Sequence, residues 1–327
     1  MVRILSETHV ESLLSVSNVL PVVETAMIKQ SRGEVTRPER PHFPVGKGID
    51  SERPDEALGT GLTMPAYIHG TDYYTTKLAS HFNENKTLGL PTITSQIVVN
   101  DAKTGLPIAV MDGTYITAIR TGCIGGLATR ELAEDPVDLA VIGAGTQARW
   151  QTRAISTTTD LKRVRVYSPT DSRFSCANEL NNELDARVEP AESPREAVKD
   201  ANVVVTATSA TSPVIDGEWL EPDTLVIAIG AFSSEMQEID QKTISRACSV
   251  FADVPEEAVE TGDLIETQLV ADDLIPLGDL FLREDTSHST DDILVVKSVG
   301  SSIFDAATAT HVVEMAKSKD IGESIGI

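Results

Sequence analysis

Three small residues, Gly143, Gly145 and Ala148, stand at the spacing G-x-G-x-x-A between an apolar run and a segment of helical pattern. Glycine at the first position permits a tight turn out of a strand, and glycine at the second lets the backbone approach a pyrophosphate. Alanine at the third position keeps the following helix close to its sheet. The N–H groups that begin this helix, at Thr146 and Gln147, are expected to hold the phosphates. The pattern predicts a dinucleotide-binding turn, and the alternative is a purely structural glycine turn.

The residues after the next predicted strand bear on the choice between NAD and NADP. Sites that prefer NAD place an acid there, which binds the ribose hydroxyls. Ser168 stands at that position here, and Ser168, Thr170 and Arg173 are suited to receive a 2′-phosphate. Asp171 keeps NAD open as the alternative. We therefore expect NADP or NAD as the cofactor, with NADP favoured.

Three cations in the first part of the chain, Arg40, Lys77 and Arg120, stand among apolar or small residues. A hydride-transferring enzyme needs one group that holds its substrate and another that moves protons. A lysine in a closed pocket can have a lowered pKa and act as an acid or a base. An arginine suits a carboxylate because its fork donates two parallel hydrogen bonds. The alternative for all three is an ordinary surface cation.

The elements that must position these cations are predicted to form a sheet with a helix. Residues 1–36 suggest a strand and a helix, and a turn-rich stretch with four prolines follows at 37–61. Alternating or apolar patterns then predict strands at 64–70, 74–82, 94–101 and 106–113. Because 100–105 has the composition of a hairpin turn, we expect an antiparallel sheet over the first ~115 residues. A long helix over 114–133 is expected to lead out of it.

From residue 137 onward, apolar strand patterns alternate with helical patterns. The predicted strands are 137–143, 163–167, 202–208, 224–230, 248–254 and 293–300. Such alternation is typical of a parallel, doubly wound Rossmann sheet, so the fold class is α/β. The last helical pattern, 303–319, is most economically placed on the first domain. We therefore predict a smaller α+β domain from residues 1–120 with 303–327, and a Rossmann domain from 121–302.

The bulk composition limits the class of protein. A chain of 327 residues with 41% hydrophobic residues is long and apolar enough for two domains with cores. No apolar run approaches the roughly 20 residues of a membrane helix. The first residues lack the basic and apolar regions of a signal peptide, so we expect a cytoplasmic protein with no membrane partner. Three scattered cysteines, and histidines without partners at ligand spacing, predict neither disulfides nor a metal site.

The charge is strongly acidic. Lys plus Arg total 27 and Asp plus Glu total 50, which gives a formal net charge of −23, and only 11 of the basic residues are Lys. This balance argues against nucleic acid as a partner. Because the acids are spread along the whole chain, we interpret the charge as adaptation to high salt, where self-repulsion is screened. A halophilic source and a fold that weakens at low salt are therefore expected.

Several motifs in order resemble the ornithine cyclodeaminase/mu-crystallin family, which includes archaeal alanine dehydrogenases and ketimine reductases. The resemblance is carried by residues 64–132, by 213–230 (PVIDGEWLEPDTLVIAIG) and by 297–307 (KSVGSSIFDAA). It implies a Rossmann domain flanked by a dimerisation domain built from both termini. A homodimer that binds a small carboxylate substrate is therefore expected.

The resemblance also implies roles for the substrate-side residues. Arg40 and Arg120 match the family's two carboxylate-binding arginines, and Lys77 matches its catalytic lysine. Met64 and Thr92 match positions that line the substrate pocket.

Further matches concern the cofactor and a second acid. Thr208 and Ser209 match the loop beside the nicotinamide, and Thr121 is expected to contact the cofactor. Asp305 matches a family aspartate near the hinge, which either orients groups of the site or pairs within the dimer core.

One position departs from the family pattern. Where ornithine cyclodeaminases carry an aspartate that binds the side-chain amine, this sequence has Phe232. A phenyl ring can neither accept a proton nor pair with an ammonium group. The nearest acids, Glu235 and Glu238, are offset, and only a shifted loop would let one of them substitute. Archaeal alanine dehydrogenases usually carry an acid here too, so Phe232 favours an apolar or cyclic imino acid as substrate.

These residues together predict an NAD(P)-dependent oxidoreductase that acts on the C–N bond of a small 2-amino or 2-imino acid. One alternative is an ornithine cyclodeaminase, a lyase that recycles its NAD. The other is a mu-crystallin-like binding protein of low activity.

Overall fold

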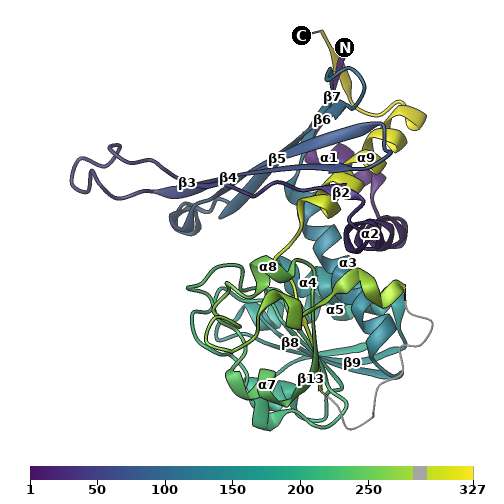
Figure 1. Ribbon diagram of the computed structural model, residues 1–327. Helices are drawn as coiled ribbons and strands as arrows, with labels where there is room; N and C mark the ends of the chain where they lie inside the picture. The colour runs from purple at the N-terminus through teal and green to yellow at the C-terminus, as the bar shows by residue number, and fades with distance from the viewer. Residues whose placement is uncertain (283–292, 327) are drawn as a thin grey trace. The chain divides into compact units, whose positions relative to one another are not determined.

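The computed structural model describes residues 1–282 and 293–326 (Figure 1). The chain forms two compact units. Unit 1 comprises Met1–Arg120 and Ser302–Ile327, and unit 2 comprises Thr121–Ser301. Across the described residues, no helix combines the length and the apolar character that crossing a membrane requires.

Unit 1 contains a mixed sheet in the order β16-β1-β7-β6-β5-β4-β2, with β3 also paired to β4. Its strands are β1 (Val2–Leu5), β2 (Val35–Thr36), β3 (His42–Val45), β4 (Gly59–Ile68), β5 (Tyr73–His81), β6 (Ile93–Asp101), β7 (Pro107–Asp112) and β16 (Glu323–Ile325). Its helices are α1 (Glu7–Leu13), α2 (Val16–Ser31), the 3-10 helix η1 (Asn83–Leu88), the first turns of α3 (Thr114–Leu132) and α9 (Ser302–Lys319). Helix α9 packs against α2 and across β4 and β5.

The predicted meander of unit 1 is confirmed in its central strands. β4, β5, β6 and β7 pair antiparallel in sequence order, and the turn between β6 and β7 is closed by Asp101. The Asp101 carboxylate accepts hydrogen bonds from the N–H groups of Lys103 and Thr104, and Gly105 adopts a φ of +74°.

The structure differs in three respects from the antiparallel sheet with a helix that was expected over the first ~115 residues. β1 pairs parallel with β7, and the C-terminal β16 extends the sheet beyond β1. The N-terminal helix is two helices, because Ser15 begins a second one with its own capping box after the extended Leu14. The turn-rich stretch also contains β3, whose Phe43 ring lies where a side chain at Gly61 would stand.

Unit 2 is an all-parallel sheet in the order β10-β9-β8-β11-β12-β15-β13-β14. Its strands are β8 (Val137–Ile142), β9 (Leu161–Tyr167), β10 (Arg187–Pro190), β11 (Val203–Thr206), β12 (Leu225–Ala228), β13 (Ala247–Ala252), β14 (Ile275–Pro276) and β15 (Ile293–Lys297). Its helices are the rest of α3, α4 (Thr146–Thr158), α5 (Ser172–Glu183), α6 (Pro194–Val198), α7 (Gln241–Arg246), α8 (Pro255–Ala258), and the 3-10 helices η2 (Gly217–Trp219), η3 (Ala271–Asp273) and η4 (Leu277–Phe281). The predicted α/β class and Rossmann-type sheet are confirmed.

The central strands of unit 2 are buried along their whole length, as expected for a parallel sheet covered on both faces. Small residues let the covering elements approach closely. A Cβ atom at Gly122 would lie 2.6 Å from the carbonyl oxygen of Trp150, so only glycine permits this contact of α3 with α4. Glycine at position 122 of α3 therefore allows α3 and α4 to pack closely.

Candidate active site

Lys77 lies in the middle of β5, in a buried position. Its cross-strand neighbours are Met64 on β4 and Ile97 on β6. The ammonium group contacts two helices of unit 1: Nζ lies 2.5 Å from Oδ2 of Asp305 on α9 and 3.3 Å from Oγ1 of Thr117 on α3. The strand thus directs its one lysine into the layer of helices that covers the sheet.

Asp305 joins Lys77 to Arg120. Its second oxygen, Oδ1, accepts a hydrogen bond of 2.9 Å from Nε of Arg120. All three side chains are buried, with exposed fractions of 1% for Asp305 and 3% for each cation. Two cations therefore share one carboxylate, and the cluster carries a net charge of +1 when all three groups are ionised.

Burial and neighbouring charges shift two pKa values in this cluster. Burial, with help from the charges of Arg120 and Arg40, lowers the pKa of Lys77 to about 8 even though Asp305 opposes the shift. Burial alone would raise the pKa of Asp305, but the charges of Arg120 and Lys77 outweigh it and hold that pKa below its usual value. Lys77 can thus both donate and accept a proton near neutral pH, beside a carboxylate whose lowered pKa favours its ionised form.

Two buried polar atoms of this region lack hydrogen-bond partners among the described residues: Nη1 of Arg120 and Oγ of Ser95. Ser95 lies on β6 opposite Ala79, two positions from the pair formed by Lys77 and Ile97, and so on the same face of the sheet as Lys77. An unpaired buried guanidinium N–H costs free energy unless an acceptor reaches it. A carboxylate is the acceptor that best matches the paired N–H donors of an arginine side chain. Ser95 was not among the site residues predicted from the sequence.

The other substrate-side candidates lie at different distances from Lys77. Arg40, half-buried between β2 and β3, is near enough for its charge to lower the pKa of Lys77. Met64 is buried directly beside Lys77. Thr92 precedes β6, where its carbonyl accepts a hydrogen bond from the N–H of Phe82. It lies five residues beyond Ile97, or about 17 Å along the strand, so unit 1 does not bring it to Lys77.

The glycine turn of unit 2 leads from β8 into α4. Gly143 has a φ of +121°, and a Cβ atom there would lie 2.3 Å from the carbonyl oxygen of Ala207. Gly145 is the N-cap of α4, and a Cβ atom on it would meet no atom within 4 Å among the described residues. Ala148 is completely buried, as close helix–sheet packing requires. The turn thus leaves open space at Gly145 and no side-chain cap at the start of α4, which begins at Thr146.

The position of this turn in the sheet fits a nucleotide. The strand order reverses between β8 and β11, and ligands of doubly wound sheets bind at the carboxyl ends of strands at such a switch point. Thr208 follows β11 and lies against Gly143, because a Cβ atom on that glycine would approach the Thr208 methyl group to 3.4 Å. Oε1 of Gln147 is buried without a partner in the described part of the chain. The residues present therefore fit a dinucleotide whose groups would fill this space.

The end of β9 carries three hydroxyls. Oγ of Ser168 lies 3.3 Å from Oγ1 of Thr170 and 3.1 Å from Oγ of Ser172. Arg173 donates to the carbonyl oxygens of Ser168 and Thr170, each at 3.2 Å, and pairs with the exposed Glu192. Arg173 therefore fixes the turn that presents the hydroxyls.

Thr121, the first residue of unit 2, is buried within α3, where its carbonyl accepts a hydrogen bond of 2.8 Å from Nε2 of Gln151. It is fixed to α4, the helix that follows the glycine turn. Ser209 is exposed next to the half-buried Thr208.

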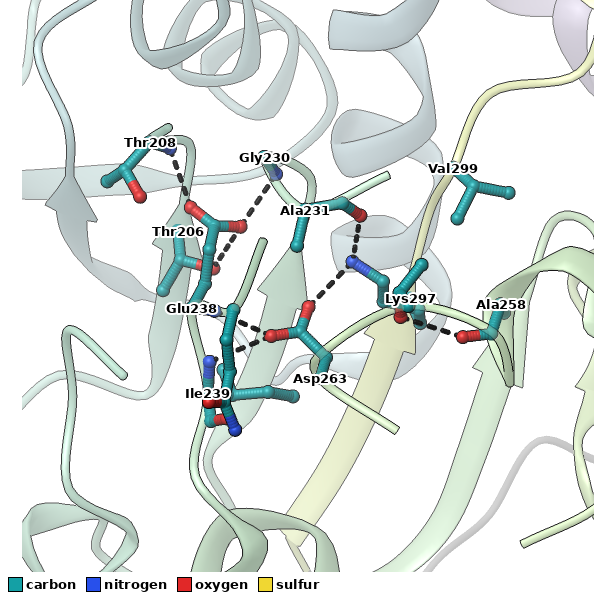
Figure 2. Close-up of polar contacts among 12 residues, drawn as sticks. Thr206, Thr208, Gly230, Ala231, Glu238, Ile239, Ala258, Asp263, Lys297 and Val299 are labelled. Carbon is teal, nitrogen blue, oxygen red and sulfur yellow. Dashed lines mark hydrogen bonds and ion pairs between the residues drawn. The ribbon is translucent and has the colours of Figure 1, made fainter. Parts of the chain in front are cut away.

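Glu238 does not substitute for the aspartate that Phe232 replaces. Figure 2 shows that its carboxylate points at the backbone of two loops. Oε1 accepts a hydrogen bond of 2.6 Å from the N–H of Thr208, and Oε2 accepts one of 2.6 Å from the N–H of Gly230. Glu235 is exposed, and Phe232 is half-buried in the loop after β12. The alternative in which a shifted loop supplies an acid is therefore not realised by Glu238.

A second buried ionic cluster in unit 2 was missed by the sequence reasoning. Lys297 is completely buried and pairs with Asp263 at 2.7 Å. The signal was present: Lys297 ends an apolar run, Ile293–Val296, that a parallel sheet buries on both faces. A lysine at such a position needs a buried acid as partner.

The described residues contain no group of three or more His, Cys, Asp or Glu side chains arranged to hold a metal ion.

Known proteins resemble this chain over its full length. Δ1-Pyrroline-2-carboxylate reductase of Bacillus cereus is 29% identical over 98% of this chain and 99% of its own. Alanine dehydrogenase of Archaeoglobus fulgidus is 31% identical over 98% of this chain and 97% of its own. The structure of Thermococcus litoralis Δ1-pyrroline-2-carboxylate reductase, in complex with NADH and L-proline, superposes with a TM-score of 0.91 at 30% identity, covering 99% of this chain and 100% of the other.

The sequence profile of the ornithine cyclodeaminase/mu-crystallin family matches residues 2–320. The resemblance inferred from the motifs is thereby confirmed in both its extent and its family. The chain belongs to the ornithine cyclodeaminase/mu-crystallin family.

Proposed function

We propose that this chain is an NAD(P)-dependent oxidoreductase that acts on the C–N bond of a small 2-imino or 2-amino acid. The observation that carries the proposal is the buried cluster of Lys77, Asp305 and Arg120, which combines a proton-transferring amine with an unpaired guanidinium donor. Relatives that reduce pyrroline-2-carboxylate or dehydrogenate alanine, at about the same identity, support this reaction class.

The arginines hold the substrate by its carboxylate. Nη1 of Arg120 supplies a buried donor, and Arg40 lies close enough to add a second positive charge. With Asp305 already neutralised by one of the two buried cations, the cluster has one positive charge left for an anion. Binding the carboxylate in a fixed orientation brings the C–N bond to one position, which is a large part of catalysis.

Lys77 moves the proton. In the reductive direction its ammonium form donates a proton to the substrate nitrogen, and in the oxidative direction its neutral form accepts one from it. The pKa of about 8 makes both forms accessible near neutral pH. Asp305 stays ionised beside it and orients the amine through the contact of 2.5 Å.

The cofactor is held by the glycine turn. Gly143, Gly145 and Ala148 let the backbone of the turn come close to the cofactor. The N–H groups at Thr146 and Gln147 donate to its pyrophosphate. Thr121, Thr208 and Ser209 are proposed to contact the nicotinamide half. A bound nicotinamide dinucleotide supplies or accepts the hydride.

The cofactor is NADP or NAD, and the end of β9 favours NADP. Ser168 and Thr170 with Arg173 offer hydroxyls and a cation to a 2′-phosphate. The bound NADH in the relative from T. litoralis supports NAD as the alternative. Steady-state rates with NADPH and NADH decide between them, and Arg173→Ala is expected to lower kcat/KM for NADPH alone if the phosphate is bound there.

An apolar or cyclic imino acid is the favoured substrate. Phe232 takes the place of the family's aspartate, and Glu238 is engaged with the backbone. No acid is thereby offered to the terminal amine of ornithine by these two residues, which argues against the cyclodeaminase alternative. The paired Lys77 argues against a binding protein without catalysis.

A homodimer is proposed as the assembly. Leu78 alternates with the buried Lys77 and so points away from the helices, and it is 44% exposed. Phe43, Leu88, Leu90 and Ile93 of the same sheet and its connections are also exposed apolar residues. Burial of such residues against a second copy would remove apolar area from water. Light scattering after size exclusion is expected to give twice the chain mass of 35.1 kDa, and a monomer would contradict the proposal.

The test of function is a direct assay. Purified protein is mixed with NADPH or NADH and with pyrroline-2-carboxylate, piperideine-2-carboxylate, or pyruvate plus ammonia, and absorbance is followed at 340 nm. Oxidation of the cofactor with at least one of them is expected. No absorbance loss with any of them would sink the proposal, and proline formed from ornithine without net NADH would instead identify the lyase.

A further inference from the structure

Glu238 is a completely buried carboxylate at the ends of two neighbouring strands (Figure 2). It accepts hydrogen bonds from three donors: Oγ1 of Thr206 at 3.0 Å, the N–H of Thr208 and the N–H of Gly230. The first two belong to β11 and the loop that follows it, and the third to the loop after β12. One side chain thus holds the backbone of two loops.

A second acid and a lysine support Glu238 from behind. Oδ1 of Asp263 accepts hydrogen bonds from the N–H groups of Glu238 and Ile239, at 2.6 and 3.0 Å. Its Oδ2 pairs with Nζ of Lys297, which also donates to the carbonyl oxygen of Ala231 at 2.5 Å. The loop after β12 is therefore held twice, by Glu238 at Gly230 and by Lys297 at Ala231.

The two loops touch at a point where only glycine fits. A Cβ atom on Gly230 would lie 2.1 Å from the carbonyl oxygen of Thr208 and 2.5 Å from Oε1 of Glu238. The separation of the loops is therefore set by backbone contact and by the carboxylate that bridges them.

Burying an ionised carboxylate costs desolvation free energy, so it contributes little net stability to the fold. Burial raises the pKa of Glu238, and the charge of Lys297 only partly opposes this. Replacing buried charges with apolar groups often leaves stability unchanged or higher. What an apolar residue would not do is accept hydrogen bonds from both loops and so fix their geometry.

The loops fixed in this way carry the residues assigned above to the cofactor and the substrate. Thr208 and Ser209 belong to the first, and Phe232 follows Ala231 in the second. We propose that Glu238 is a positioning residue, which sets the two loops of unit 2 for productive alignment of the nicotinamide while touching neither cofactor nor substrate. This inference rests on the proposed function.

The test compares two substitutions that remove different contacts. Glu238→Gln keeps the shape, but its amide NH₂ must face either the N–H of Thr208 or that of Gly230, so one loop is released. Asp263 and Lys297 remain paired in this variant. Thr206→Val is the matched control, because it removes one buried hydrogen bond to Glu238 and leaves both loop contacts in place.

The first readout is amide hydrogen exchange of residues 207–212 and 229–233, which needs no substrate. Glu238→Gln is expected to speed exchange in at least one of these segments, whereas Thr206→Val leaves both near the wild-type rate. Added NADPH or NADH, whichever the protein binds, is expected to protect 207–212 in the wild type, and Glu238→Gln is expected to lose most of this protection.

The second readout is kinetic. For a misplacement of about 1 Å, kcat is expected to fall by about 10- to 100-fold in Glu238→Gln. The KM for the imino acid is expected to stay within about threefold of wild type, because the arginines that grip the carboxylate are unaltered. Thr206→Val is expected to keep kcat within about threefold of wild type.

Three results would overturn the inference: unchanged exchange in Glu238→Gln, equal loss of kcat in both variants, or no protection of 207–212 in the wild type by either NADPH or NADH. If Glu238→Gln does not fold, Glu238→Asp takes its place. It keeps the charge but is too short to reach both N–H groups, so the same changes are expected. An inactive wild type would reject the proposed function, while the exchange measurements would still decide the role of Glu238.

Discussion

The two units each bury an ionic cluster around a lysine, and the clusters have opposite balance. In unit 1, two cations, Lys77 and Arg120, share one carboxylate, Asp305. In unit 2, Lys297 pairs with one carboxylate, Asp263, which in turn accepts a hydrogen bond from the backbone N–H of a second buried acid, Glu238. Ionised, the first cluster carries +1 and the second −1.

The clusters also differ in how their polar atoms are satisfied. In unit 2 the carboxylate oxygens accept from backbone N–H groups and a hydroxyl, so the excess negative charge is met by dipoles of the chain itself. In unit 1 a guanidinium donor, Nη1 of Arg120, has no partner within the described residues. A cluster whose polar atoms all have partners within the chain is suited to fix backbone segments, and one that leaves a donor and a charge unmatched is suited to bind an anion.

Replacing each lysine by methionine separates these two roles with the largest effect. Lys77→Met leaves Asp305 paired with Arg120, so the fold is expected to survive while kcat falls by about 10³-fold through loss of the proton-transferring group. Lys297→Met leaves two buried carboxylates without a cation and is expected to cost about 3–5 kcal/mol of unfolding free energy.

The measurements are initial rates at 340 nm, NADH binding by fluorescence, and denaturant unfolding. NADH binding is expected to persist in Lys77→Met. Wild-type kcat in Lys77→Met would contradict the proposed proton-transfer role of Lys77. Wild-type stability in Lys297→Met would contradict the structural role of Lys297.

Arg120→Lys tests the unmatched donor. Lysine keeps the charge but loses the fork that would pair with Asp305 and a substrate carboxylate at once. The KM for the imino acid is expected to rise by about 100-fold, close to the 2–3 kcal/mol of a charge-assisted hydrogen bond. A substrate analogue without its carboxylate serves as control, because its slow turnover should be insensitive to the substitution.

The sequence predicted the fold and much of the unit 1 cluster, for a physical reason. Alternation of buried strands with helices is a local pattern, and so is the glycine turn after β8, so both could be inferred from short segments. Strands β2, β3, β10, β14 and β16 were missed because they are short and depend on pairing with segments elsewhere in the chain.

The unit 2 cluster could not be inferred in the same way. Glu238, Asp263 and Lys297 are separated by 25 and 34 residues, and most contacts of the two acids are with backbone N–H groups, which leave no residue-type signature. Only Lys297 at the end of an apolar run signalled a buried partner. Arg120 and Lys77 became candidates as cations among apolar or small residues, and the resemblance to a family gave them roles, while their link through Asp305 required the structure.

The pH profile of kcat/KM tests the role of Lys77 in the unit 1 cluster. Its pKa of about 8 means that the ammonium form is present below pH 8 and is lost as the pH rises through that value. The kcat/KM for imino-acid reduction is therefore expected to fall about tenfold per pH unit above 8, and that for amino-acid oxidation to rise up to pH 8 and then level off.

Asp305→Asn is expected to shift the pH at which kcat/KM for imino-acid reduction begins to fall, which is called here the basic limb of the profile. Since the carboxylate of Asp305 raises the pKa of Lys77, its removal is expected to shift the limb below pH 8. Profiles measured with both directions of the reaction would share one inflection. Different inflections, or a limb that stays in place in Asp305→Asn, would assign the proton transfer to another group.

Salt is expected to affect the acidic surface but not the buried clusters, and its effect on Tm is the smallest of those predicted. With a net charge of −23, exposed acids repel one another, and molar KCl shortens the screening length to about 3 Å. Relief of about 1–2 kcal/mol would raise Tm by roughly 1.5–3 °C between low and molar KCl. Charges buried in the two clusters are screened far less, so the inflection near pH 8 is expected to stay in place over the same range. Melts that do not change with KCl would contradict adaptation to salt, whereas an inflection that moves with KCl would mean that solvent reaches the Lys77 cluster.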